Sequence, residues 1–341
     1  MSPVIDVREV TKIFGRNPER ALALLRAGRG KPEIQAETGN VIGLDRVSLS
    51  VEAGEIFVVM GLSGSGKSTL IRHVNRLVDP TSGGIVVNGV DVMAMGAAGL
   101  RAYRRNTVSM VFQRFGLLPH RSVLDNVAFG LEVKGVGLDD RNAAARRWIE
   151  TVGLAGYERS RPRQLSGGEQ QRVGLARALA MDTPILLMDE AFSALDPLNR
   201  AQLQDELLAL QHRLRKTILF ITHDFDEALK LGTRIAVLRD GAVEQVGRPE
   251  EIVLHPATAH VAAFVRQVSR ARAIPLAAVM ERGAFAPYAA SLPATARCED
   301  ALALFAAHAW IGVLDADGVP VGRVGVAAVL EALAQPAGRT P

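Results

Sequence analysis

The chain has 341 residues, of which 48% are apolar, so it is long enough for one large α/β domain and a smaller one. Its single cysteine, Cys298, excludes a disulfide framework and a cysteine-based zinc site within one chain, and we expect it to be a small buried hydrophobe. The net charge of +4 is modest and the basic residues are spread out, which argues against a nucleic-acid partner.

The first residues lack the basic and then apolar pattern of a signal sequence, and no run of 18 apolar residues occurs. We therefore expect neither export nor a membrane span. A reducing, cytosolic setting fits the single cysteine.

The first third of the chain alternates strands with one helical stretch. Residues 4–10 alternate like a strand, and residues 16–40 predict a small helical insertion that begins at Asn17 and Pro18. Residues 47–51 alternate again, and a turn at residues 53–55 leads into an apolar run at residues 56–60, which predicts a buried strand.

Residues 61–69 form a glycine-rich segment directly after that buried strand, and we call them the phosphate loop. Glycines allow backbone N–H groups to turn inward around an anion, and the following helix N-terminus adds to the attraction. Lys67 would reach the β- and γ-phosphates, and Ser68 would face a magnesium ion. The pattern therefore predicts binding of a nucleoside triphosphate. The expected contacts are Gly61, Leu62, Ser63, Gly64, Ser65, Gly66, Lys67, Ser68 and Thr69.

The remaining elements alternate between strand and helix, which predicts a doubly wound sheet. Asn88 and Gly89 indicate a hairpin turn, and a strand at residues 108–112 ends at Gln113. The other expected elements are a helix at 70–78, polar-faced helices between 119 and 163, a helix at 170–180, a buried strand at 185–188, and strands at 217–222 and 234–238 separated by a helix.

Asp189 and Glu190 follow the second apolar strand. Adjacent residues on a strand point in different directions, so one acid can face a magnesium ion and the other an attacking water molecule. A helix cap or a surface pair is the favoured interpretation for such a pair in isolation. The phosphate loop upstream reverses that preference.

Residues 165–172 read Leu-Ser-Gly-Gly-Glu-Gln-Gln-Arg, and they open a helix with a second potential anion site. This segment resembles the signature sequence of the ATP-binding-cassette (ABC) family. A phosphate loop is also found in kinases, GTPases and helicases, but the ordered set of motifs favours the ABC family. The resemblance covers about residues 4–270 and implies the P-loop fold of an ABC nucleotide-binding domain, with a mixed sheet and a helical subdomain at about 114–168.

The resemblance also assigns roles to single residues. Phe14 matches the aromatic that stacks on adenine, and Gln113 matches the glutamine that joins magnesium and water to the helical subdomain. Glu190 would polarise the attacking water, and His223 would contact the γ-phosphate. Asp196 lies in the loop at residues 193–196 that crosses the dimer interface. Glu169 occupies a position where close relatives often have another residue.

The family mechanism implies a head-to-tail homodimer with ATP and Mg²⁺ as cofactors. Each ATP would lie between the phosphate loop of one subunit and, from its partner, Ser166, Gly167, Gly168 and Asp196. Ser68, Gln113 and Asp189 would serve the magnesium ion. Lys67, Glu190 and His223 would be the catalytic residues.

Local features at residues 16–40, 75–83, 117–123 and 189–197 resemble the ATP-binding subunit of bacterial quaternary-amine importers, which take up glycine betaine, proline betaine or choline. This implies two membrane permease subunits that dock near residues 113–134, an extracytoplasmic substrate-binding protein, and a peripheral location on the cytoplasmic face of the inner membrane. An amino-acid (proline-type) importer and a soluble non-transport ABC ATPase remain alternatives.

Composition shifts after about residue 272, so we expect an ABC domain at residues 1–272 and a smaller domain at 273–341. The tail predicts a helix at 298–309, strands at 310–314 and 319–324, and a helix at 326–333. It resembles a single CBS-type module, which could sense ionic strength or an adenine nucleotide, or could serve as a dimerisation module. A chain that is mainly a regulatory binding subunit is a third interpretation.

Overall fold

The structure is a computed structural model that describes residues 3–113, 116–193, 195–266, 270–283, 285 and 288–334. Its contacts divide the chain into two compact units. The first comprises Met1–Asp224 and Ala236–Val243, and the second comprises Phe225–Ile235 and Glu244–Pro341. Among the helices of the described residues, none combines the length and the hydropathy needed to cross a membrane.

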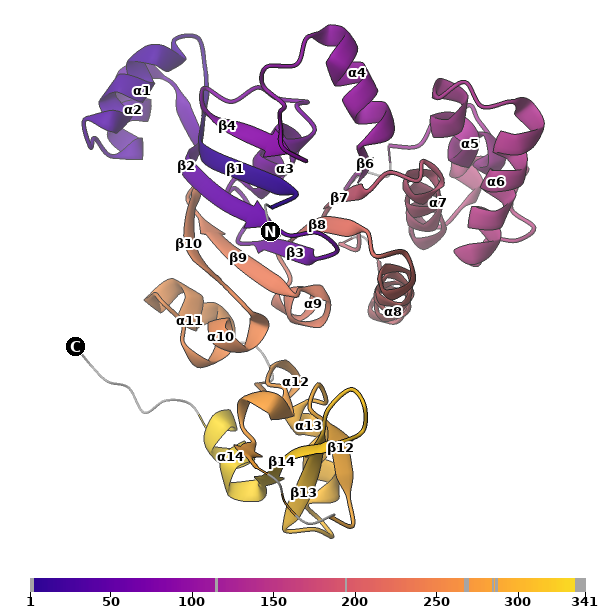
Figure 1. Cartoon of the computed structure of the whole chain (residues 1–341). Helices are drawn as coiled ribbons and strands as arrows, with labels where there is room; N and C mark the ends of the chain where they lie inside the picture. Colours follow the sequence, from indigo (N-terminus) through magenta and orange to yellow (C-terminus); the bar gives the residue numbers. More distant parts are fainter. Residues whose placement is uncertain are drawn as a thin grey trace. The chain divides into compact units, whose positions relative to one another are not determined.

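An antiparallel sheet with the strand order β2-β1-β4-β5 carries the helical insertion of the first unit (Figure 1). The predicted insertion is confirmed: two helices lie between β1 and β2, and Ala21, Leu22 and Ile34 bury a small core against Ile13. Asn88 and Gly89 both have positive φ, and the predicted hairpin is confirmed. The bounds are β1 (Ile5–Phe14), α1 (Pro18–Arg26), α2 (Lys31–Thr38), β2 (Val41–Val51), β4 (Ser82–Val87) and β5 (Val90–Asp91).

A six-stranded sheet with the order β10-β9-β3-β8-β7-β6 carries the other predicted strands. The pairs β3/β8, β8/β7 and β7/β6 are parallel, and every residue of β3, β7 and β8 is buried. This explains their continuous apolar runs, since both faces are covered. The bounds are β3 (Ile56–Met60), β6 (Val108–Val111), β7 (Ile185–Asp189), β8 (Thr217–Thr222), β9 (Arg234–Arg239) and β10 (Ala242–Gly247).

The helix after the phosphate loop, α3 (Lys67–Val74), begins earlier and ends earlier than the predicted 70–78. It begins after Gly66, whose φ of 99° provides the sharp turn out of the loop. It ends because Arg76 adopts a φ of 50°, and the N–H groups of Leu77 and Val78 return to the carbonyl of Arg72.

Three helices share a separate apolar core in which Val127, Ile149 and Val173 are fully buried. They are α5 (Val123–Val133), α6 (Leu138–Thr151) and α7 (Gly167–Ala180). The predicted helical character of residues 119–163 is thus confirmed as two helices. The other helices are α4 (Ala97–Asn106), η1 (Pro162–Gln164), α8 (Pro197–Leu214), α9 (Phe225–Leu231), α10 (Pro249–Leu254) and α11 (Ala259–Val265).

The C-terminal part contains a sheet with the order β11-β14-β13-β12, in which β12 runs parallel to β13. The helix predicted at 298–309 ends at Leu304, because the N–H groups of Ala307 and His308 both bond the Leu304 carbonyl and the chain turns into β13. Cys298 is buried as expected, and burial raises its pKa to about 11. The bounds are α12 (Arg270–Ala273), η2 (Leu276–Ala278), β11 (Glu281–Arg282), β12 (Ser291–Pro293), α13 (Cys298–Leu304), β13 (Trp310–Leu314), β14 (Pro320–Gly325) and α14 (Val326–Leu333).

Candidate nucleotide and magnesium site

The phosphate loop joins β3 to α3, and its glycines are required by conformation and by space. Gly61, Gly64 and Gly66 have φ values of 154°, 83° and 99°. A Cβ on Gly61 would lie 2.2 Å from the carbonyl oxygen of Leu238, and one on Gly66 would lie 2.5 Å from that of Gly43. The glycines therefore allow the backbone to turn closely at this loop, as an anion cradle demands.

Lys67 is buried within this loop. Its Nζ donates hydrogen bonds to the carbonyl oxygens of Gly61 at 2.7 Å and Leu62 at 2.9 Å. Burial lowers the pKa of Lys67, while the charges of Glu190 and Asp189 oppose that shift. The ammonium group therefore lies inside the loop, where it can meet phosphate oxygens directly.

Ser68 and Asp189 form a pair at the start of α3 and the end of β7. Ser68 Oγ donates to Asp189 Oδ1 at 2.7 Å. Asp189 is 1% exposed, and among the described residues its Oδ2 accepts no hydrogen bond, although Arg72 Nη2 lies 3.5 Å away. Burial raises the pKa of Asp189, against the opposing effects of Ser68 and Arg72. A hydroxyl and an unfilled carboxylate oxygen are suitable ligands for a hard cation such as Mg²⁺.

The side chains of Gln113 and His223 both lie close to the carboxylate of Glu190. Gln113 Nε2 donates to Glu190 Oε2 at 2.8 Å, and His223 Nδ1 lies 3.4 Å from the same oxygen. The Glu190 backbone has a φ of 46°, a left-handed conformation that costs about 1–2 kcal/mol in a residue with a side chain. Gln113, His223 and Glu190 follow three neighbouring parallel strands, so their convergence comes from the sheet. Gln113 contacts Glu190 in this structure, not the Ser68–Asp189 pair.

Phe14 ends β1 and has 43% of its surface exposed. A Cβ at residue 43 would lie 2.7 Å from Phe14 Cε2, so the ring packs on the bare backbone of Gly43. Lys12 Nζ lies 5.2 Å from the ring centroid. The exposed surface of the ring is available to a planar base.

Ser166 and Asp196 lie at helix N-termini. Ser166 accepts from the Glu169 N–H at 3.3 Å, and Glu169 Oε2 accepts from the Ser166 N–H at 2.7 Å, which completes a capping box on α7. The Ser166 N–H and hydroxyl both donate to Glu169 Oε2, and these two hydrogen bonds lower the pKa of Glu169. Asp196 caps α8 by accepting from Asn199. Gly167 and Gly168 are the first two residues of α7, and Ala194 lies outside the described residues.

Two residues without an expected role, Arg72 and Gly43, also contact the site. Arg72 lies four residues after Ser68 on α3, a spacing that places both side chains on one helix face. That spacing was an available signal for Arg72. No pattern near Gly43 in the sequence indicated its role, because that role depends on Phe14 and Gly66, which pack against it and are distant in the sequence.

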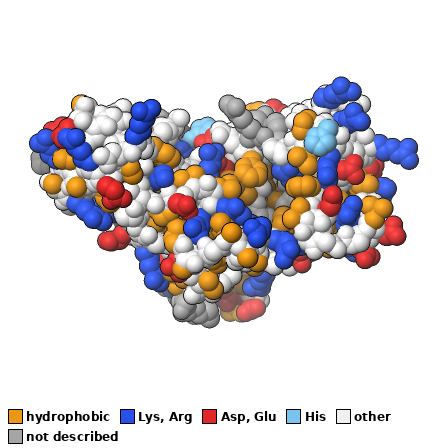
Figure 2. All heavy atoms as spheres, turned by 90° about the horizontal axis from the view of Figure 1, so that it is seen from above, with side chains coloured by type: hydrophobic (Ala, Val, Ile, Leu, Met, Phe, Trp, Pro, Cys, Tyr) orange, Lys and Arg blue, Asp and Glu red, His pale blue; other side chains and the backbone are white. Residues whose placement is uncertain are grey.

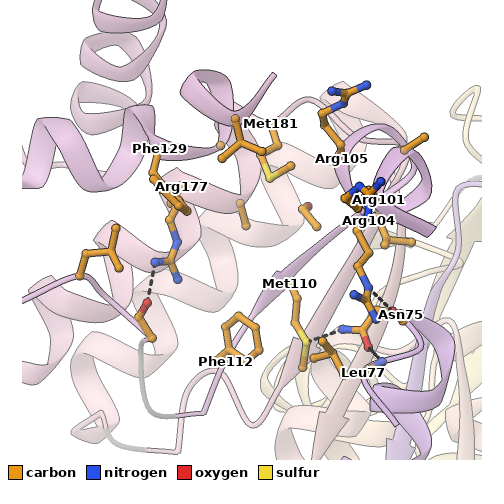
Figure 3. A pocket seen from close by; sticks show the side chains of 18 of the residues that line it. Asn75, Leu77, Arg101, Arg104, Arg105, Met110, Phe112, Phe129, Arg177 and Met181 are labelled. Atoms are coloured by element: carbon orange, nitrogen blue, oxygen red, sulfur yellow. Dashed lines mark hydrogen bonds between the residues drawn. The ribbon is translucent and has the colours of Figure 1, made fainter. Parts of the chain in front are cut away.

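A groove of about 750 Å³ is lined in part by Phe112, the residue that precedes Gln113 in the sequence (Figure 3). Its apolar lining includes Leu77, Met110, Phe112, Phe129 and Met181, from segments that include β6, α5 and the end of α7. Four arginines also line it: Arg101, Arg104, Arg105 and Arg177. Arg177 Nη1 donates to the Gly116 carbonyl at 2.7 Å. Seen from above, apolar and basic side chains lie side by side on the molecule (Figure 2).

Comparison with known proteins decides the family. Residues 44–193 match the model of the ABC transporter family. The chain is 54% identical over 278 residues to the glycine betaine/carnitine transport ATP-binding protein GbuA of Listeria monocytogenes, covering 82% of this chain and 70% of that protein. The chain is an ABC transporter ATP-binding protein. The resemblance inferred from the motifs is thereby confirmed, and the protein is an ATPase.

Two further similarities extend this result. The trimethylamine N-oxide transport system ATP-binding protein TmoW of Ruegeria pomeroyi is 54% identical over 273 residues, which is 80% of each chain. The dimeric post-hydrolysis structure of the ATP-binding cassette MJ0796 bound to ADP and Pi aligns with a TM-score of 0.62 and 31% identity, covering 72% of this chain and 98% of that one. The expected P-loop fold of an ABC nucleotide-binding domain is confirmed, with mixed α/β sheets.

Proposed function

We propose that this ABC ATPase energises the uptake of quaternary amines, namely glycine betaine, proline betaine or choline. The observation that carries the proposal is the 54% identity to a glycine betaine/carnitine transport protein over 82% of this chain. A glycine betaine/proline betaine transport protein of Escherichia coli, ProV, is 50% identical over 79% of the chain.

The residues of the site divide the hydrolytic work. Lys67 and the amides of the phosphate loop bind the triphosphate, and the exposed ring of Phe14 stacks on the base. Glu190 is placed to accept the proton of the attacking water, while Gln113 and His223 fix the orientation of its carboxylate. Ser68 and Asp189 hold Mg²⁺, which offsets charge on the phosphate oxygens.

We infer that the working form is a homodimer. Ser166, which is exposed, and Asp196 lie at helix N-termini, where backbone N–H groups attract anions. In the proposed head-to-tail dimer, Ser166, Gly167, Gly168 and Asp196 of one subunit meet the nucleotide held by the other. The similarity to a dimeric ABC cassette bound to ADP and Pi supports this arrangement.

Two membrane permease subunits would take up the conformational change that ATP hydrolysis drives in this chain. An extracytoplasmic substrate-binding protein would deliver the cargo to them. The groove lined in part by Phe112 supports a permease partner, because its apolar floor suits a short amphipathic helix and its arginines suit acidic side chains. Gln113 lies next to Phe112 in the groove wall and contacts Glu190. The chain would thus be a peripheral protein on the cytoplasmic face of the inner membrane.

An amino-acid importer is the second candidate. The methionine import ATP-binding protein MetN of Caulobacter vibrioides is 48% identical, but over 66% of this chain. The amine-transport relatives match over a longer part of the chain at equal or higher identity, which favours quaternary amines.

Reconstitution with a membrane permease and a substrate-binding protein tests the proposal. We expect ATP-dependent uptake of labelled glycine betaine, proline betaine or choline, and none when the ATPase carries Glu190→Gln. Uptake of proline or methionine without uptake of any betaine would move the cargo to the amino-acid class. ATPase activity that responds to nucleic acid and to no permease would contradict transport.

We further propose that residues 273–341 form a single CBS-like module after an ABC domain at residues 1–272. The order β12, α13, β13, β14, α14, with helices after strands on one small sheet, supports this assignment. Dimerisation is the favoured role and sensing of ionic strength or an adenine nucleotide the alternative. Truncation after residue 272 separates them: loss of salt or nucleotide control of transport indicates a sensor, whereas weaker self-association with unchanged control indicates dimerisation.

A further inference from the structure

The helical insertion between β1 and β2 has no role in the mechanism above, yet it contacts a turn that is hydrogen-bonded to the phosphate loop. Lys31 is the first residue of α2 and is partly buried. Its Nζ donates a hydrogen bond to the backbone carbonyl of Asp240. Asp240 and Gly241 form the turn between β9 and β10, with φ values of 48° and 75°. The insertion is thus attached to a turn about 200 residues away in the sequence.

Gly241 connects that turn to the phosphate loop. Its N–H donates to the Ser65 carbonyl at 3.0 Å, and its own carbonyl accepts from the Asp45 N–H at 2.8 Å. Ser65 also lies against the catalytic lysine, because its Oγ is 3.5 Å from Lys67 Nζ. The turn therefore bonds the loop on one side and β2 on the other.

β2, the Asp240–Gly241 turn and the phosphate loop are packed too closely to admit an added Cβ atom at Gly241 or Gly66. A Cβ on Gly241 would lie 2.6 Å from the Gly43 carbonyl oxygen, and a Cβ on Gly66 would lie 2.5 Å from the same atom. Three backbone segments from β2, the turn and the loop thus meet at van der Waals contact. A displacement of the turn would be transmitted to the loop, because close-packed groups cannot move independently.

We propose that Lys31 is a positioning residue for ATP binding: it holds the Asp240–Gly241 turn against β2 and the phosphate loop, and so keeps the loop in its anion-binding conformation. The inference rests on ATP binding by this chain and is independent of the cargo. Burial lowers the pKa of Lys31, and the charges of Asp45 and Asp240 oppose this, so carboxylates around the junction favour the ammonium form.

The main test is Lys31→Met, which keeps the aliphatic stem and removes the donor. We expect the Kd for ATP and the KM of hydrolysis to rise by about tenfold, a typical cost of losing one charged hydrogen bond, with kcat changed less than about twofold. Hydrogen exchange of the loop amides should accelerate in the nucleotide-free protein. Lys31→Arg should restore affinity, because it keeps a charged donor.

Arg20→Met is the matched control, since Arg20 is a cation on the same insertion that pairs with Glu37 at 2.8 Å, at the surface. It should leave ATP affinity and loop exchange unchanged. If Lys31→Met does not fold, Lys31→Leu provides the same comparison, because leucine also lacks a donor. A folded Lys31→Met variant with normal ATP affinity would overturn the proposal, as would an equal loss in Arg20→Met. Normal ATP binding by the wild type and the control keeps this test separate from that of the nucleotide site.

Discussion

Gln113 donates a hydrogen bond from its side-chain nitrogen to Oε2 of Glu190, across 2.8 Å. The same carboxylate lies 3.4 Å from His223 Nδ1. Gln113 directly follows Phe112, which lines the groove, so adjacent residues join the groove wall to the Glu190 carboxylate. We therefore expect a partner docked in the groove to affect hydrolysis through this hydrogen bond.

Glu190→Gln should retain ATP binding and lose most of its turnover, by about 10²–10⁴-fold, because the amide cannot accept the proton of water. The blocked protein should accumulate as a nucleotide-bound dimer, detectable by size-exclusion chromatography with ATP and Mg²⁺. Glu150→Gln, at an exposed position of α6, is the control and should hydrolyse ATP normally. Near-normal hydrolysis by Glu190→Gln would remove Glu190 from the role of base.

Lys67→Ala should fail at an earlier step, because the loop loses its phosphate-binding cation. We expect ATP affinity to fall by at least about tenfold, corresponding to about 1.4 kcal/mol. Equilibrium binding of a fluorescent ATP analogue measures it. Unchanged affinity would show that the loop amides suffice for binding.

Asp189→Asn should stabilise the nucleotide-free protein at neutral pH. Burial raises the pKa of Asp189 in the folded chain, so the native state binds a proton more readily than the unfolded state does. The contribution of Asp189 to the free energy of unfolding is fully present below about pH 3.9, the pKa of an aspartate in the unfolded chain. It is lost as the pH rises through the higher pKa of the native state. The melting temperature of Asp189→Asn should therefore exceed that of the wild type at pH 7, with the difference shrinking toward pH 4.

The same variant should gain no stability from Mg²⁺ and ATP beyond that given by ATP alone, whereas the wild type should. Ser68 can still donate to the Asn amide oxygen, so local packing is retained. A wild-type melting temperature above that of the variant at pH 7 without ligand would contradict the effect of burial.

Phe14→Ala should weaken ATP and GTP binding alike, by about tenfold, because base–aromatic stacking contributes about 1–3 kcal/mol and needs only a flat ring. Phe14→Tyr should preserve binding. Val41→Ala is a suitable control, since Val41 pairs with Phe14 in the sheet and is also exposed. Selective loss of ATP over GTP would indicate recognition by hydrogen bonds instead.

Ser166→Ala should abolish the ATP-dependent dimer when combined with Glu190→Gln, while leaving ATP binding to the single chain intact. Loss of the helix cap costs about 1 kcal/mol of stability, so its melting temperature should fall slightly. Glu169→Gln is the control, because a glutamine at that position also completes a capping box. A normal dimer in the Ser166 variant would place the contact to the partner's nucleotide elsewhere.

Where sequence prediction worked, the structure was fixed by short-range geometry. The helical insertion, the Asn88–Gly89 turn and the buried strands of the parallel sheet follow from prolines at the helix starts, positive φ and continuous apolar runs. Several element bounds were wrong. β2 begins at Val41, before the strand predicted at 47–51, and β10 was not predicted. α3 ends at Val74 and α13 at Leu304, because backbone N–H groups after each helix bond back to carbonyls near its end.

The order of motifs along the chain, by itself, determined that this protein binds a nucleoside triphosphate and belongs with ABC ATPases, because a backbone phosphate cradle needs glycines at fixed spacing. Tertiary structure decided what those residues touch. Gln113, Glu190 and His223 meet only when parallel strands place their ends along one edge of a sheet, and Lys31 meets the Asp240 carbonyl only when the insertion folds. Such contacts depend on the whole packed core, so no local pattern in the sequence encodes them.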